Sequence, residues 1–169
     1  DAAADTIDGG EGIDTLDASA ARASVVVDLA AGVASGAEIG RDTIASIERV
    51  IGGAGDDVLT GSDADETFEG GGGSDEIRAG AGDDVVVGSA DGANDTLDGG
   101  AGTDTLDLSA MRESVSVDLV GGVARGAEIG EDTITGFETI ATGAGDDRIT
   151  VNACKASVVS GGAGQDVFA

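Results

Sequence analysis

The stretch that decides the fold is residues 52–87, GGAGDDVLTGSDADETFEGGGGSDEIRAGAGDDVVV, which divides into four nine-residue units without a break. Glycine favours positions one, two and four of each unit, an acidic residue holds position six, and an apolar residue holds position eight. After the inserted pair Gly88–Ser89 the period resumes for two further units. The position-eight residues are Leu59, Phe68, Ile77, Val86, Leu97 and Leu106. A fixed short period of this kind predicts a repeat architecture in which each unit stacks on its neighbours.

A longer period of about 90 residues encloses the short one. VVVDLAAGVASGAEIGRDTI from Val25 returns as VSVDLVGGVARGAEIGEDTI from Val115. The chain therefore reads as two copies, residues 1–90 and 91–169, of one continuous module. Each copy combines blocks of nonapeptides with an intervening segment, residues 18–51 in the first copy and 108–141 in the second.

The composition excludes several function classes. The chain has 34 Asp plus Glu against 8 Lys plus Arg, a net charge of −26, so we expect no nucleic-acid partner, because phosphate binding needs a basic surface. The absence of His removes most general acid–base chemistry and makes a zinc site improbable. We expect no membrane insertion, since no apolar run is long enough to span a bilayer. The single Cys154 cannot form an internal disulfide and is expected to be a partly buried small residue.

The pattern Gly-Gly-x-Gly-x-Asp-x-apolar-x resembles the calcium-binding nonapeptide of the repeats-in-toxin (RTX) family, also called haemolysin-type repeats. The resemblance implies an all-β fold, a right-handed parallel β-roll (β-solenoid) of stacked turns with calcium ions between them. Two nonapeptides make one coil, so turns two units apart stack on the same side. The stacked carboxylate pairs are then Asp57–Asp75, Asp75–Asp95, Asp84–Asp104 and Asp147–Asp166, with Glu66 facing Asp84.

Calcium chemistry explains why these residue types recur. Ca²⁺ takes six to eight oxygen ligands, more than one turn supplies, and glycine lets the backbone approach an ion. We expect roughly 4–10 ions. The candidate carboxylate ligands are Asp5, Asp14, Asp42, Asp57, Glu66, Asp75, Asp84, Asp95, Asp104, Asp132, Asp147 and Asp166. The candidate turn glycines are Gly10, Gly12, Gly53, Gly55, Gly71, Gly73, Gly80, Gly82, Gly92, Gly100, Gly102, Gly143, Gly145, Gly162 and Gly164.

The intervening segments are less regular. SVVVDLAAGVASG and SVSVDLVGGVARG are expected to form a longer strand and a turn, and AEIGRDTIA and AEIGEDTIT are degenerate nonapeptides with Asp42 and Asp132 at position six. We expect the coil to continue through these segments, widened or bulged, and a solvated loop is the alternative. The remaining acidic residues there are expected to be surface charges, namely Glu38, Glu48, Glu128 and Glu138. Residues at positions seven and nine, such as Thr105 and Asp107, are expected to face solvent.

The resemblance implies a calcium-binding module without catalysis of its own, secreted or at the bacterial cell surface. We expect it to fold on calcium binding after type I secretion and to belong to a larger parent chain such as a toxin or adhesin. The alternative is a structural segment of a surface-layer or adhesin protein, with calcium-bridged self-assembly. An ice-binding or carbohydrate-related module is less favoured, because positions three and five of the repeats carry no regular Thr or Asn row.

Overall fold

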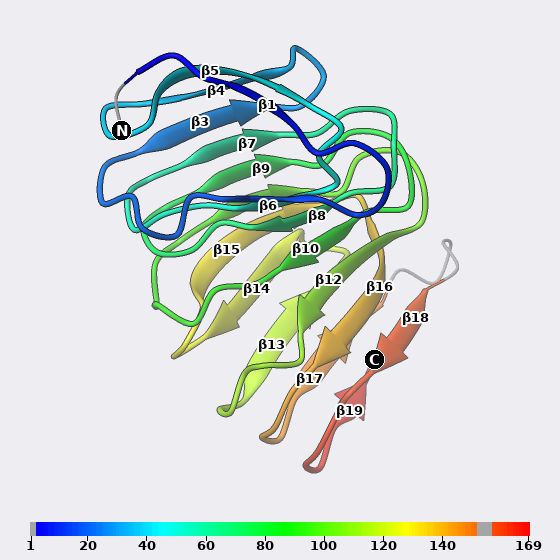
Figure 1. The fold of residues 1–169 in the computed structure, drawn as a ribbon. Coiled ribbons are helices and arrows are strands. Elements are labelled where there is room, and N and C mark those ends of the chain that lie inside the picture. The colour runs from blue at the N-terminus through cyan, green and yellow to red at the C-terminus, as the bar shows by residue number, and fades with distance from the viewer. Residues whose placement is uncertain (1–2, 152–156) are drawn as a thin grey trace.

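The computed structural model describes residues 3–151 and 157–169, and the expectation for Cys154 lies outside these residues. The described residues contain strands, turns and bends and no helix, and no helix that could span a membrane is found among them. The strands form two sheets, of twelve and seven strands. Figure 1 shows the strands lying side by side, with the amino-terminal and carboxy-terminal coils at opposite ends of the stack.

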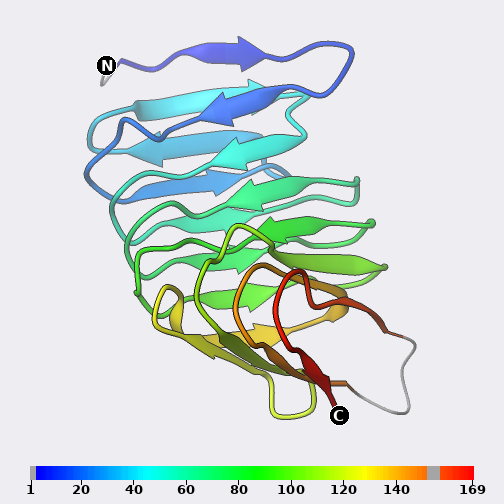
Figure 2. The same cartoon turned by 90° about the horizontal axis from the view of Figure 1, so that it is seen from below.

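The nonapeptide coils alternate between the two sheets. Positions seven to nine of each unit form a three-residue strand, and each strand pairs in parallel with the strand two units away. The seven-stranded sheet has the order β18 (Val158–Ser160), β16 (Phe137–Thr142), β12 (Asp104–Leu108), β10 (Val85–Val87), β8 (Thr67–Glu69), β6 (Arg49–Ile51) and β2 (Thr15–Asp17). Figure 2 shows these rungs in succession. This is the parallel β-roll expected from the sequence.

The twelve-stranded sheet carries the other half of each coil. Its order is β1 (Thr6–Asp8), β5 (Gly40–Ala45), β4 (Val33–Gly36), β3 (Val25–Asp28), β7 (Val58–Thr60), β9 (Glu76–Arg78), β11 (Thr96–Asp98), β15 (Gly130–Thr135), β14 (Val123–Gly126), β13 (Val115–Asp118), β17 (Arg148–Thr150) and β19 (Val167–Phe168). Because each copy inserts extra strands into this sheet only, the two sheets differ in strand number.

The intervening segments supply those extra strands. In the first copy β3 and β4 form an antiparallel hairpin, and β4 then pairs antiparallel with β5. The same arrangement recurs 90 residues later in β13, β14 and β15. The coil does continue through these segments, because β5 pairs in parallel with β1 and β6 with β2. The expected widening takes the form of an antiparallel hairpin inside a parallel sheet, where one longer strand and a turn had been expected.

The core is a thin column of aliphatic side chains between the sheets. The position-eight residues Leu59, Phe68, Ile77, Val86 and Leu106 are at most 1% exposed. Position-seven and position-nine residues point away from this column, but Thr105 and Asp107 are half-buried, because neighbouring strands flank them on both sides. Each nine-residue unit therefore buries one large apolar side chain. The hydrophobic free energy of one such side chain is small compared with the entropy lost by ordering nine residues.

Candidate metal centre

Two edges of the roll carry columns of carboxylates, at the points where the turns lead into the strands. Asp57, Asp75, Asp84 and Asp104 are all at most 3% exposed although each is acidic. Position six lies two residues before the buried apolar residue, so period-two alternation turns its side chain inward as well. The repeat that builds the apolar column therefore also buries the carboxylates beside it.

A ladder of hydrogen bonds joins the carboxylates of successive coils. The backbone N–H of Asp57 donates to Asp75 Oδ1 at 2.8 Å, and the N–H of Asp84 donates to Asp104 Oδ1 at 3.0 Å. We call this set the inner ladder. Its donor–acceptor pairs are Asp5–Asp42, Asp14–Glu48, Asp57–Asp75, Glu66–Asp84, Asp75–Asp95, Asp84–Asp104, Asp95–Asp132, Asp104–Glu138 and Asp147–Asp166. The structure thus brings the twelve predicted carboxylates together in stacked pairs.

Sequence reasoning missed two members of the inner ladder. Glu48 and Glu138 were expected to be surface charges, but this is wrong: Glu138 is only 8% exposed, and Glu48 is half-buried. Glu48 accepts the N–H of Asp14, and Glu138 accepts the N–H of Asp104. The signal was present, because each glutamate lies two residues before a buried aliphatic, Val50 or Ile140. It was overlooked because no glycine-rich turn precedes these residues.

Glu38 and Glu128 have a different role. The Glu38 carboxylate accepts the backbone N–H groups of Arg22 and Ala23, and Glu128 does the same for Arg112 and Glu113. These bonds hold the pKa of both glutamates below its usual value. The two residues therefore fasten the loop before each hairpin and stand apart from the inner ladder.

Glycine makes the close stacking of the turns possible. Gly102 has a φ of 148°, and a Cβ at this position would clash with the carbonyl oxygen of Gly82 in the neighbouring turn. A Cβ would clash in the same way with the glycine carbonyl oxygen of the neighbouring turn at four further positions: Gly71 with Gly53, Gly100 with Gly80, Gly162 with Gly143, and Gly164 with Gly145. Gly10 and Gly12 belong to the first turn, and a Cβ on either would meet no atom within 4 Å. Glycine therefore lets the backbones of adjacent turns approach one another closely.

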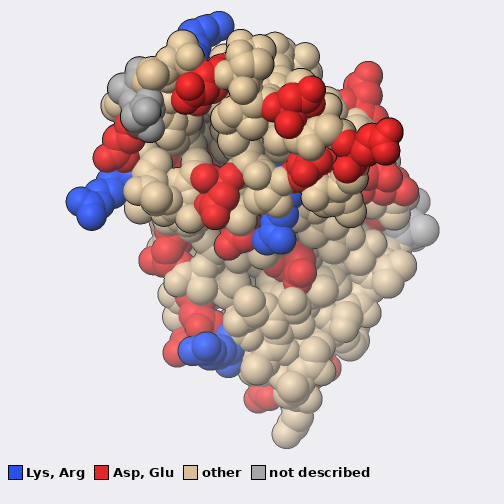
Figure 3. All heavy atoms as spheres, in the orientation of Figure 1, with Lys and Arg blue, Asp and Glu red and all other residues tan. Residues whose placement is uncertain are grey.

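The buried aspartates of the inner ladder form no ion pair with the residues that the structure describes. The ion pairs found among the described residues, Arg49–Glu69, Arg78–Glu76 and Arg125–Glu131, are solvent-exposed and include no inner-ladder carboxylate. In the described part of the chain Asp75 Oδ2, Asp84 Oδ2, Asp104 Oδ2 and Asp147 Oδ2 are buried without a hydrogen-bond donor. Figure 3 shows acidic side chains spread over the face in view and few basic ones.

Burial raises the pKa of three inner-ladder carboxylates, Asp75, Asp84 and Asp132. Desolvation is the main cause that raises the pKa of Asp75 to about 7, and the neighbouring charges of Asp95 and Asp57 raise it further. Desolvation likewise raises the pKa of Asp132 to about 7 and that of Asp84 to about 6. A buried carboxylate in this state is stabilised by a proton or by a metal cation.

The donor set fits calcium. All candidate ligand atoms are carboxylate or carbonyl oxygens, which hard cations such as Ca²⁺ prefer, whereas zinc and copper favour nitrogen and sulfur ligands. Within residues 3–151 and 157–169, no three acidic side chains converge on one point. Most ligands of each ion would therefore be backbone carbonyls of the glycine turns, with one or two carboxylates completing the set.

The family comparison agrees with this geometry. The protein-family model described as the RTX calcium-binding nonapeptide repeat (4 copies) matches residues 1–21, 42–77, 60–92, 89–110 and 132–154, more than half of the chain. The chain belongs to the RTX calcium-binding nonapeptide repeat family. The segments 22–41 and 111–131 lie outside the match and contain the β3–β4 and β13–β14 hairpins. A comparison with curated proteins gives no match.

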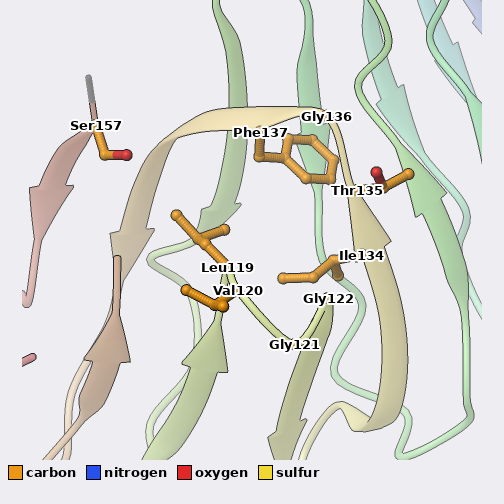
Figure 4. Close-up of a pocket in the computed structure, with 9 residues that line it drawn as sticks. All are labelled: Leu119, Val120, Gly121, Gly122, Ile134, Thr135, Gly136, Phe137 and Ser157. Carbon is orange, nitrogen blue, oxygen red and sulfur yellow. The ribbon is translucent and has the colours of Figure 1, made fainter. Parts of the chain in front are cut away.

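The second hairpin borders a hollow that differs from the carboxylate columns of the RTX turns. A cavity of about 280 Å³ lies beside the second hairpin, lined by residues that include Leu119, Val120, Ile134 and Phe137. Figure 4 shows these side chains gathered around one space, with no acidic side chain among the lining residues. The hollow offers no ligand set for a cation, so the RTX turns remain the candidate metal centre.

Proposed function

We propose that this RTX module folds when calcium binds to its turns, and that it is a structural part of a larger secreted protein. The observation that carries the proposal is a set of buried oxygens, Oδ2 of Asp75, Asp84, Asp104 and Asp147, which have no hydrogen-bond donor and no ion pair among residues 3–151 and 157–169. Without a cation these groups oppose folding, because each buried negative charge is desolvated and repels its neighbours along the column.

Two kinds of oxygen in the chain would bind the ions. Asp57, Asp75, Asp84, Asp104 and Asp147 would hold the ions together with the carbonyl oxygens of the stacked glycine turns. Bound calcium supplies positive charge and coordination to oxygens of two turns. Because these oxygens lie far apart in the unfolded chain, the free energy of metal binding becomes free energy of folding.

This coupling suits export. Extracellular calcium modules bind with dissociation constants of about 10⁻⁴–10⁻³ M, so such a module stays empty at low cytosolic calcium and fills outside the cell. An unfolded, strongly acidic chain is a suitable substrate for a secretion channel. The proposal gives the module no catalytic role, and the activity of the parent protein resides elsewhere.

Far-UV circular dichroism during a calcium titration tests the proposal. We expect a disordered spectrum in chelator and a β-sheet spectrum at millimolar calcium, whereas magnesium at the same concentration restores little, since Mg²⁺ gives up its water reluctantly. Spectra that are equally folded with and without chelator would refute the proposal. Light scattering in the same titration tests calcium-bridged self-assembly: particles that grow with calcium favour the surface-layer or adhesin role, and a constant monomer contradicts it.

A further inference from the structure

A second ladder of hydrogen bonds runs outside the carboxylate columns, through position five of the repeats. The N–H of Asp83 donates to Asp65 Oδ1, and the N–H of Thr103 donates to Asp83 Oδ1, both at 2.8 Å. We call this set the outer ladder. Its donor–acceptor pairs are Ser74–Asp56, Asp83–Asp65, Thr103–Asp83, Glu131–Asn94, Asp146–Ser114 and Gln165–Asp146.

The two ladders run in opposite directions. In the inner ladder a backbone N–H donates to the side chain of the following coil, as Glu66 does to Asp84. In the outer ladder the N–H donates to the side chain of the preceding coil, as Asp83 does to Asp65. Each of these pairs of stacked turns is thus tied in both directions by adjacent residues, which fixes both the spacing and the register of the turns.

The chemistry at position five differs from that of a metal ligand. Asp56, Asp65, Asp83 and Asp146 are exposed, whereas the position-six carboxylates beside them are buried. An uncharged acceptor serves equally well, because Asn94 Oδ1 accepts the N–H of Glu131 at 2.9 Å and Ser114 Oγ accepts that of Asp146 at 2.9 Å. Position five therefore requires an acceptor of suitable reach and does not require a charge.

An ordinary solvated acidic residue in the same turn provides the contrast. Asp63 is exposed like Asp65, and in the described part of the chain its side chain has no hydrogen bond. Both carboxylates add negative charge near the inner ladder: Asp63 raises the pKa of Glu66, and Asp65 raises that of Asp84. Asp63 and Asp65 therefore have the same charge and are both exposed, but only Asp65 accepts a hydrogen bond from the next coil.

We propose that the position-five side chains of the outer ladder couple neighbouring calcium turns, so that filling one site favours filling the next. The proposal rests on the calcium-binding function proposed above. An ion that takes oxygens from two turns requires those turns at a fixed spacing, and a bond that sets the spacing at one site also presents the shared turn to the next site. Such coupling is a free energy between sites and shows itself as cooperativity of binding.

Four single variants of the intact chain test the coupling: Asp65→Ala, Asp65→Asn, Asp63→Ala and Asp84→Asn. Asp65→Ala removes the acceptor and the charge, Asp65→Asn keeps the acceptor, and Asp63→Ala removes a nearby charge that makes no tie. Asp84→Asn removes a buried inner-ladder carboxylate and serves as the ligand control. Each variant is titrated with calcium, and both the midpoint and the Hill coefficient are measured by isothermal titration calorimetry and circular dichroism.

We expect Asp65→Ala to lower the Hill coefficient and to raise the calcium midpoint about two- to tenfold, the range that corresponds to one hydrogen bond. Asp65→Asn and Asp63→Ala should keep the Hill coefficient of the parent chain. Asp84→Asn should reduce the number of ions bound, whereas Asp65→Ala should leave that number unchanged, because Asp65 is a positioning residue.

Two results would overturn the proposal. If Asp65→Ala and Asp63→Ala behave alike, position five contributes charge alone. If Asp65→Asn loses ions as Asp84→Asn does, Asp65 is a ligand. A parent chain that shows no calcium response refutes the proposed function separately; the outer ladder is then tested by thermal unfolding, in which Asp65→Ala must melt below Asp63→Ala for the tie between coils to stand.

Discussion

The nonapeptide coils and the two antiparallel hairpins lie in the same twelve-stranded sheet, but different interactions stabilise them. A coil strand buries one large apolar side chain, such as Leu59, and its turn carries a buried carboxylate. The first strand of each hairpin buries two, Val25 and Val27 in β3 and Val115 and Val117 in β13. The hairpin strands pair antiparallel with a neighbour only a few residues away in the sequence.

The acidic residues show the difference most clearly. In the coils Asp104 is fully buried and accepts the N–H of Asp84, a residue of the preceding coil. In the hairpin Asp118 accepts the N–H groups of Val120 and Gly121 within its own four-residue connection. The first carboxylate joins distant parts of the chain and is buried, whereas the second is half-buried and caps a local turn. The hairpins are therefore local insertions into a fold whose coils, under the proposed function, depend on calcium.

The largest expected effect separates these two acidic residues. At saturating calcium, Asp104→Ala should lower the free energy of unfolding by about 3 kcal/mol, because it removes a proposed metal ligand and leaves the buried N–H of Asp84 without its acceptor. The matched hairpin variant Asp118→Ala should cost about 1 kcal/mol or less, since water replaces the lost acceptor. Chemical denaturation at fixed calcium measures both. Equal losses would show that coil and hairpin carboxylates contribute in the same way.

The second expected effect concerns pH in the presence of chelator. The pKa of Asp75 and Asp132 is raised to about 7, and that of Asp84 to about 6, so the folded chain binds protons more tightly than the unfolded chain does. The stabilisation from these protons is complete below the unfolded pKa and is lost as the pH rises through about 6–7. Without calcium, β-sheet content should therefore increase as the pH falls from 8 towards 5, because protons replace the metal charge in part.

Single substitutions test whether this pH response comes from the carboxylates of the coils. Asp75→Asn removes one titrating group from the inner ladder and should flatten the response in chelator, measured as the circular dichroism midpoint against pH. Asp28→Asn at the end of β3 keeps an acceptor for the N–H of Ala31 and should leave the response as it is in the parent chain. A parent chain whose β-sheet content is independent of pH in chelator would contradict the assignment.

The contrast also explains what the sequence could predict. The nonapeptide period places the strands, the apolar column and most inner-ladder carboxylates, because all of them depend on local spacing and on stacking two units apart. The direction of β4 was not predictable, since the run from Ser24 to Gly36 fixes the side-chain alternation but not the strand partner. The outer ladder was missed because its acceptors at position five are Asp, Asn and Ser, three residue types that share only a side-chain oxygen.

The smallest expected effect concerns the junction between the two sheets, where β5 leads into β6 in the first copy and β15 leads into β16 in the second. Ser46 joins β5 to β6 with a φ of 55°, and the second copy has Gly136 there with a φ of 80°. A left-handed conformation costs an L-residue about 1–2 kcal/mol, and glycine avoids that cost but loses more backbone entropy on folding. Ser46→Gly should therefore raise the free energy of unfolding by about 0.5 kcal/mol, seen as a small rise in the thermal midpoint at saturating calcium.

The reciprocal change, Gly136→Ser, should be clearly destabilising. A Cβ at Gly136 would lie 2.5 Å from the backbone nitrogen of Gly100, in the neighbouring glycine turn. The first copy thus accepts a side chain at this junction and the second does not. The reciprocal variants should therefore change the free energy of unfolding in opposite directions. If Ser46→Gly instead lowers the thermal midpoint, the exposed serine contributes more than its backbone strain costs, and the first copy is adapted to serine at this turn.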